Sequence, residues 1–131
     1  MATASTLTTT TLILRYILTL QLFLGGQARL TSRLTPTLHR RAMAKAAGTQ
    51  RHLPFIPIGD PVRHTNVIGA LMCAAGTLLC APQTRLAGGV LAICLTLAGV
   101  YTQYRMGIPW WLPAVNTVLA GLVIWGEVGR G

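Results

Sequence analysis

Acidic residues are almost absent from this sequence. Its 131 residues include two carboxylate side chains, Asp60 and Glu127, against eleven Lys or Arg, and charged residues make up 10% of the chain. Soluble domains carry roughly 25% charged residues, so this composition excludes an ordinary soluble domain. Intrinsic disorder is also excluded, because 52% of the residues are hydrophobic and disordered chains are poor in apolar residues. The class that remains is an integral membrane protein with a single domain, residues 1–131.

Charged residues are missing altogether from three long stretches. Residues 64–84, 86–104 and 106–126 form gaps of 21, 19 and 21 residues between successive charges, and a helix needs about 20 apolar residues to cross about 30 Å of hydrocarbon. The apolar cores of these gaps are hydrophobic on every face, which is typical of membrane helices and not of striped helices in soluble bundles. We therefore expect membrane spans over residues 66–82, 86–104 and 109–126.

A fourth apolar run, residues 7–26, is interrupted by Arg15. We expect it to form the first span, which makes the fold all-α: an up-and-down four-helix bundle integral to the membrane. Two alternatives stay open. One is a cleaved signal peptide, although the segment lacks a positively charged start and a clear cleavage site. The other is a mitochondrial presequence, because the first 59 residues contain no acidic side chain and are rich in Arg and Thr.

Positive charge is concentrated in the expected loop between the first two spans, residues 27–65. This basic loop holds Arg29, Arg33, Arg40, Arg41, Lys45, Arg51 and Arg63 against Asp60. The positive-inside rule places it in the cytoplasm, with Arg105 on the same side and Arg85 and Arg130 on the other. The expected partner of the loop is the anionic headgroup layer of the bilayer, and nucleic acid is not expected. The endoplasmic reticulum or plasma membrane is favoured, with a mitochondrial membrane as the alternative.

Metal-ligand spacing is missing as well. Cys73, Cys80 and Cys94 fall inside expected spans without a C-x-x-C pair, and the three histidines are twelve or thirteen residues apart. We therefore expect no metal and no cofactor. The ionisable candidates for acid–base chemistry lie at span ends: Asp60, His64 and Glu127. Asp60 is also expected to cap the helix that begins at Pro61.

Polar residues at membrane depth are the better leads, because they are costly in lipid and face the interior of a bundle. Arg15 and Asn116 are expected near mid-depth, and with Tyr101 and Gln103 they form our candidate intramembrane polar site. One hypothesis is that Asn116 and Glu127 satisfy the Arg15 guanidinium. The alternative is that Arg15 extends its side chain to the headgroup layer, or that the span shifts along the membrane normal.

Two further patterns concern packing and depth. Small residues recur every fourth position at Gly69, Cys73 and Thr77 and again at Gly88, Ala92 and Thr96. Such rows let helix backbones approach closely in lipid, and we expect packing within the chain in preference to dimerisation. Aromatic residues gather around one link, at Tyr101, Tyr104, Trp110 and Trp111, as expected for an interfacial belt.

Four short motifs resemble the DoxX-like family of small membrane proteins, in the branch that includes the nicotinic-receptor chaperone NACHO. The motifs are RLTPTL at residues 33–38, LPFIPIG at 53–59, IGALMCAAGTLLCAP at 68–82, and the Gly107 to Pro109 step. The resemblance implies a four-helix membrane bundle with an accessory role, and for some members a link to quinone-dependent oxidation. Family members often carry Glu, His and Asp where this chain has Met72, Gln103 and Ile108, so no catalytic role is transferred to these positions.

Two classes of function follow. The first is a non-catalytic accessory protein that assists a membrane-associated pathway or a membrane protein partner. The second is a membrane-embedded enzyme acting on an apolar small molecule, such as a cyclase, an isomerase or a quinone-linked redox component, in secondary-metabolite biosynthesis. The shortage of ionisable side chains favours the accessory role, because general acid–base catalysis needs a group with a usable pKa. Transport of a small molecule or ion is a weaker third interpretation.

Overall fold

The structure, a computed structural model, describes residues 2–130 and the side chains of residues 9–129. Residues 1 and 131 of the expected domain lie outside the described residues. The chain folds into five helices: α1 (Ala2–Leu30), α2 (Pro36–His52), α3 (Pro61–Cys80), α4 (Arg85–Arg105) and α5 (Trp111–Arg130). No strand occurs within residues 2–130. The expectation of an all-α fold is confirmed.

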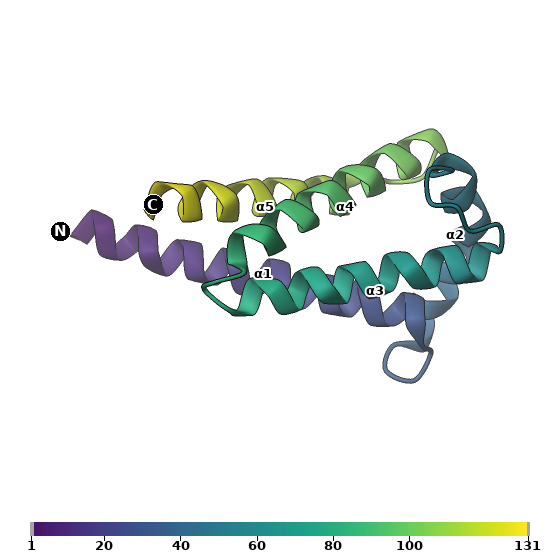
Figure 1. Ribbon diagram of the computed structural model, residues 1–131, viewed down its shortest axis with the longest axis horizontal. Helices are drawn as coiled ribbons and strands as arrows, with labels where there is room; N and C mark the ends of the chain where they lie inside the picture. Colours follow the sequence, from purple (N-terminus) through teal and green to yellow (C-terminus); the bar gives the residue numbers. More distant parts are fainter. Residues whose placement is uncertain (1, 131) are drawn as a thin grey trace.

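Four of the helices run side by side along the long axis of the molecule (Figure 1). The helix α1 packs against α3 and α5, and α4 completes the ring by packing against α3 and α5. Neighbouring helices in this ring are antiparallel, so α1 begins and α5 ends at the same end of the molecule, which we call the terminal end. The helix α2 lies at the opposite end, against α1 and α3.

The core lies between these four helices. Its fully or nearly buried side chains come from all of them: Leu18, Leu22, Ala75, Leu79, Ala92, Leu119, Ala120 and Val123. The core positions of α1 and of α3 are four residues apart, and those of α5 span one turn, so each set lies on one helix face. The core is made of aliphatic side chains, while many other large apolar residues of α1, α4 and α5 are exposed.

Glycines set the distance between helices at two crossings. A Cβ placed on Gly69 of α3 would lie 2.7 Å from the Gly26 carbonyl oxygen of α1, and one on Gly88 of α4 would lie 2.8 Å from the Leu79 amide nitrogen of α3. Both distances are too short for any side chain, so these backbones touch directly. The expectation that the small-residue rows pack within the chain is confirmed at Gly69 and Gly88.

Three helices are long and apolar enough to cross a membrane: Thr9–Leu30, Arg85–Arg105 and Trp111–Gly129. They correspond to the expected spans over residues 7–26, 86–104 and 109–126. The helix α3, which contains the expected span 66–82, is not among them. Its first turns hold Arg63, His64 and Asn66, which leaves residues 67–80 as an uninterrupted apolar segment of only about 21 Å at 1.5 Å per residue.

The connection over residues 27–65 contains a helix that the sequence analysis treated as loop. Its helix α2 begins with Pro36 in the first turn, where a missing N–H costs nothing, and its buried residues are Ala42, Ala46 and Thr49. This face is narrow and built from small side chains. It seats α2 closely on the ends of α1 and α3 and leaves the basic side chains on its remaining surface.

Two turns position the ends of the long helices. Asp60 is the N-cap of α3, and its carboxylate accepts a hydrogen bond from the Val62 N–H at 3.1 Å, which confirms the expected cap. At the end of α4, the N–H of Gly107 donates to the Tyr104 carbonyl and the N–H of Ile108 donates to the Gln103 carbonyl. This pair of bonds is a Schellman motif, and it requires the positive φ of 72° that Gly107 adopts.

Candidate functional site

The four residues of the expected intramembrane site are distributed along the length of the molecule. Arg15 lies near the middle of α1, and Asn116 lies in the second turn of α5, nearer the end covered by α2. Tyr101 and Gln103 belong to the last turns of α4, at the end covered by α2. There the Tyr101 ring meets the His52 ring of α2 edge-on, with 6.4 Å between centroids. The structure therefore does not bring the four side chains together at one depth.

Arg15 and Glu127 have different neighbours from those in our hypothesis. The Arg15 guanidinium lies over the ring of the adjacent Tyr16, 5.7 Å from its centroid. Glu127 accepts from Arg85, and its Oε1 lies 3.3 Å from the Arg85 Nη1. Within the described residues, no hydrogen bond or ion pair connects Arg15 to Asn116 or Glu127.

The Arg85–Glu127 ion pair is the main polar contact of the terminal end. The two side chains are 7% and 13% exposed, and the Arg85 Nε also donates to the Leu79 carbonyl at 3.3 Å. The pair joins the first turn of α4 to the last turn of α5. The sequence places Arg85 between two expected spans and Glu127 at a span end, and no local pattern indicates that the two residues meet.

Asn116 lies at the same level as a second amide residue, Gln21 of α1. Thr11 of α1 lies 3.1 Å from the position that a Cβ would take on Gly126 of α5. Gln21 is ten residues further along α1, and Asn116 is ten residues back along the antiparallel α5, so each lies about 15 Å from that contact. Gln21 was missed by the sequence analysis, although it is the one amide side chain within the expected first span.

The side-chain carbonyl oxygens of Gln21 and Asn116 are shielded from solvent and accept no hydrogen bond within the described residues. An unpaired buried acceptor costs about 1–3 kcal/mol. At the next position of α5, the Thr117 hydroxyl donates to the Thr96 hydroxyl of α4 at 3.0 Å. The middle of the molecule therefore has a polar level in an otherwise aliphatic interior, with two acceptors open to a hydrogen-bond donor.

The expected ionisable groups at span ends lie at opposite ends of the molecule. Asp60 is exposed and 3.9 Å from Arg63, while Glu127 is at the terminal end. His64 is completely buried, and its Nε2 lies 3.1 Å from the Leu53 carbonyl oxygen. Because that oxygen can only accept, the Nε2–H donates to it, and Nδ1 has no hydrogen-bond partner within the described residues.

Eight of the eleven basic side chains gather at the end covered by α2, which we call the basic end. Its carboxylate is the exposed Asp60, and the other carboxylate of the chain, Glu127, lies at the far end. Burial differs among these cations: the Arg29 side chain is partly buried and donates to the Thr65 hydroxyl at 2.6 Å. The eight are Arg29, Arg33, Arg40, Arg41, Lys45, Arg51, Arg63 and Arg105.

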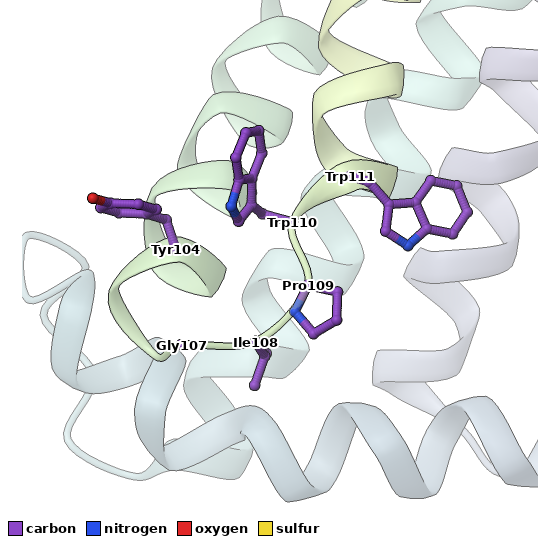
Figure 2. Close-up of a pocket in the computed structure, with 6 residues that line it drawn as sticks. All are labelled: Tyr104, Gly107, Ile108, Pro109, Trp110 and Trp111. Carbon is purple, nitrogen blue, oxygen red and sulfur yellow. The ribbon is translucent and has the colours of Figure 1, made fainter.

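An aromatic hollow of about 550 Å³ lies beside the basic end, at the link between α4 and α5. It is shallow and lined by Tyr104, Trp110 and Trp111 together with the Gly107 to Pro109 turn. Figure 2 shows the two indole rings directed to opposite sides of the link. All three aromatic side chains are exposed, which fits amphipathic rings at a membrane–water boundary better than an enclosed ligand cage.

Residues 2–130 contain no group of three or more His, Cys, Asp or Glu side chains that could hold a metal ion. The three cysteines are free thiols on α3 and α4. Comparison of the chain with protein-family models, with curated proteins and with solved structures found no match.

Proposed function

We propose that this chain is a small multi-pass membrane accessory protein of the DoxX-like type. The ring of α1, α3, α4 and α5 is a four-helix bundle embedded in the bilayer, with its basic end at the cytoplasmic, anionic leaflet. In this role the protein assists a membrane-associated pathway or a membrane protein partner. The proposal for the family rests on the four sequence motifs.

The observation that carries the proposal is the separation of apolar surface and charge. Only 17% of the apolar windows in α1 and α5 and 28% of the window in α4 are buried within the molecule. Large apolar side chains such as Leu20, Val118 and Trp125 are each more than 60% exposed. A surface of this kind needs an apolar solvent. Positive charge is confined mainly to one end, where each Lys or Arg near an anionic leaflet contributes about 1 kcal/mol of attraction.

The short apolar segment of α3 fits the same arrangement. Its polar first turn lies at the basic end beside α2, so Arg63 and Asn66 reach the headgroup layer while residues 67–80 cover the hydrocarbon. A short span is accommodated by local thinning of the bilayer and by polar side chains that extend to the interface. The neighbouring helices α1 and α4 also cover α3 along its length.

The first test is topology. Single cysteines introduced at Thr37 on α2 and at Gln83 in the α3–α4 link, in a variant in which the three native cysteines are Ser, report which compartment each end faces. We expect an impermeant maleimide added to intact cells to label Gln83→Cys and to label Thr37→Cys only after permeabilisation. Equal labelling of both positions in intact cells would contradict a spanning bundle.

The accessory role is tested by mass spectrometry of lipid-soluble extracts from cells with and without the gene. An accessory protein is expected to change a whole pathway evenly, without accumulation of one intermediate. Capture of a membrane partner by the detergent-solubilised full chain is then the next measurement. A single discrete intermediate that accumulates in the absence of the gene would contradict the accessory role.

One observation favours a second candidate, a membrane-embedded enzyme for an apolar substrate. The unpaired carbonyl oxygens of Gln21 and Asn116 can accept hydrogen bonds from a substrate hydroxyl at mid-depth, and holding a reactive substrate in one orientation can remove about 7–11 kcal/mol of barrier in favourable cases. In this case membranes with wild-type protein convert the accumulated intermediate, and Asn116→Leu abolishes conversion. The matched control is Gln83→Leu, which removes an exposed amide and leaves conversion intact.

A further inference from the structure

Three cations of the basic end belong to two different helices that are held firmly together. Arg29 lies in the last turn of α1, and Arg41 and Lys45 lie one turn apart on α2. A ring nitrogen of His39, Nδ1, lies 2.8 Å from the Ala28 carbonyl oxygen and fastens the start of α2 to the end of α1. The three charges are therefore brought together by the fold and not by flexible chain ends.

Lys45 and Arg29 are both partly withdrawn from solvent. Lys45 is half-buried beside Ala46, which belongs to the face that α2 presents to the rest of the molecule. The Arg29 guanidinium is anchored by its Nη1 to the Thr65 hydroxyl at 2.6 Å, and Thr65 is completely buried. A guanidinium has five N–H donors, so this anchor leaves most of its donors available to another group.

The electrostatics of this cluster are unfavourable in the protein alone. Burial, followed by the positive charges of Arg29 and Arg41, lowers the pKa of Lys45 below its ordinary value. Like charges one helical turn apart, as at Arg41 and Lys45, are destabilising. The chain cannot supply a counter-charge from its carboxylates, because Asp60 pairs with Arg63 and Glu127 is at the other end of the molecule.

We propose that Arg29, Arg41 and Lys45 form a binding site for a phosphate group. A phosphate monoester carries a charge of about −1.5 to −2 and three strong acceptor oxygens, which matches three cations held on neighbouring helix ends with open N–H donors. Arginine forks bind phosphate oxygens in pairs, and lysine adds a point charge. The phosphate belongs either to a lipid headgroup or to a free anion. The lipid source rests on the proposed function, because it requires the basic end at a membrane surface; the free anion does not.

The test uses the purified full chain in nanodiscs of phosphatidylcholine, with unfolding temperature followed by tryptophan fluorescence. In one arm, inorganic phosphate replaces sodium chloride at constant ionic strength, so that screening of diffuse charge stays the same. In the other arm, phosphatidic acid is included in the nanodisc and the buffer is free of phosphate. We expect stabilisation of the wild type in at least one arm, and the arm that responds identifies the source.

Variants separate a built site from diffuse attraction. Lys45→Met is expected to weaken apparent phosphate affinity about tenfold, as for the loss of one charge-assisted hydrogen bond, and Lys45→Arg is expected to retain it. Arg40→Gln removes the same charge from an exposed position of α2 and is expected to change affinity less than about twofold. Circular dichroism of each variant confirms the wild-type helix content.

The outcomes separate cleanly. Equal weakening by Lys45→Met and Arg40→Gln would show attraction to the basic end as a whole and would overturn the site, as would the absence of stabilisation in both arms. A third outcome is equal maleimide labelling of Thr37→Cys and Gln83→Cys together with stabilisation by inorganic phosphate. This result would overturn the proposed function and would leave the phosphate site intact.

Discussion

The buried ion pair between Arg85 and Glu127 provides the sharpest test of how this fold is held together. Its two side chains are 7% and 13% exposed, so neither charge can be solvated if the other is removed. Removing one partner of a buried pair costs about 3–5 kcal/mol, because it leaves an uncompensated charge. We therefore expect Glu127→Ala to lower the free energy of unfolding by about 3 kcal/mol or more.

The chain contains its own control, because its second ion pair is exposed. Arg63 and Asp60 are 81% and 54% exposed and lie 3.9 Å apart, and exposed pairs contribute about 0–1 kcal/mol. Arg63→Ala is therefore expected to have little effect. Arg63 is the better partner to replace, because Asp60 also caps α3.

The assay is unfolding in a mild detergent by titration with a denaturing detergent, followed by tryptophan fluorescence. The double variant with Arg85→Met and Glu127→Leu should recover most of the loss, because an apolar pair of similar volume is often neutral in place of a buried ion pair. The double-mutant cycle is needed because Arg85 also donates to the Leu79 carbonyl, and only the cycle isolates the pair. A loss in Glu127→Ala no larger than that in Arg63→Ala would refute the reasoning.

The remaining predictions concern backbone positions and one titration, and all are measured by the same unfolding assay. Asp60→Ala is expected to lower stability by about 1 kcal/mol, whereas Asp60→Asn should retain it because asparagine also caps. Gly107→Ala should lower the free energy of unfolding by about 1–2 kcal/mol, because Gly107 has a φ of 72° and a Cβ is unfavourable there. An unchanged free energy of unfolding would contradict the turn described at the end of α4. Gly69→Ala should lower the free energy of unfolding by about 1–3 kcal/mol, because the new Cβ meets a backbone carbonyl of α1. Gly59→Ala is the control and should leave stability unchanged, because a Cβ at Gly59 has no neighbour within 4 Å. The pKa of Lys45 is lowered on folding, so the folded state binds the Lys45 proton less tightly than the unfolded state does. In phosphate-free buffer, the free energy of unfolding should therefore rise as pH increases from the lowered pKa towards the unfolded value of about 10.4. The Lys45→Met variant should lose this rise.

The positions of the long helices were predictable because charge is so rare in this chain. Each gap between successive charges became a helix, and Arg63, Arg85 and Arg105 all fall within a few residues of a helix end. The cap at Asp60 was equally predictable, because Asp followed by Pro is a strong local signal for a helix start.

The helix α2 was not predicted because its buried face consists of small residues. Ala42, Ala46 and Thr49 give a weak apolar pattern, and the surrounding Arg and Lys residues dominate the composition of that segment. A helix of this type is stabilised by its contacts with α1 and α3, which the local sequence does not reveal.

The polar contacts were harder to predict than the helices. Arg85 and Glu127 are 42 positions apart, and Gln21 and Asn116 are further apart still, so the contact of the first pair and the common level of the second depend on how the helices are arranged in the ring. Arg15 and Asn116 were predicted as partners because both are expected near the middle of the membrane. The register set by Thr11 and Gly126 shows that Gln21 lies at the level of Asn116.

The contact between α1 and α5 has a consequence for the order of assembly. Because α5 follows α1, α3 and α4 in the chain, the ring of these four helices closes only after α5 has been synthesised. Until then the Gln21 amide and the core side chains Leu18 and Leu22 face whatever surrounds the nascent chain. We therefore expect α1 to pair with α3, through the direct contact of Gly26 and Gly69, before α5 is in place.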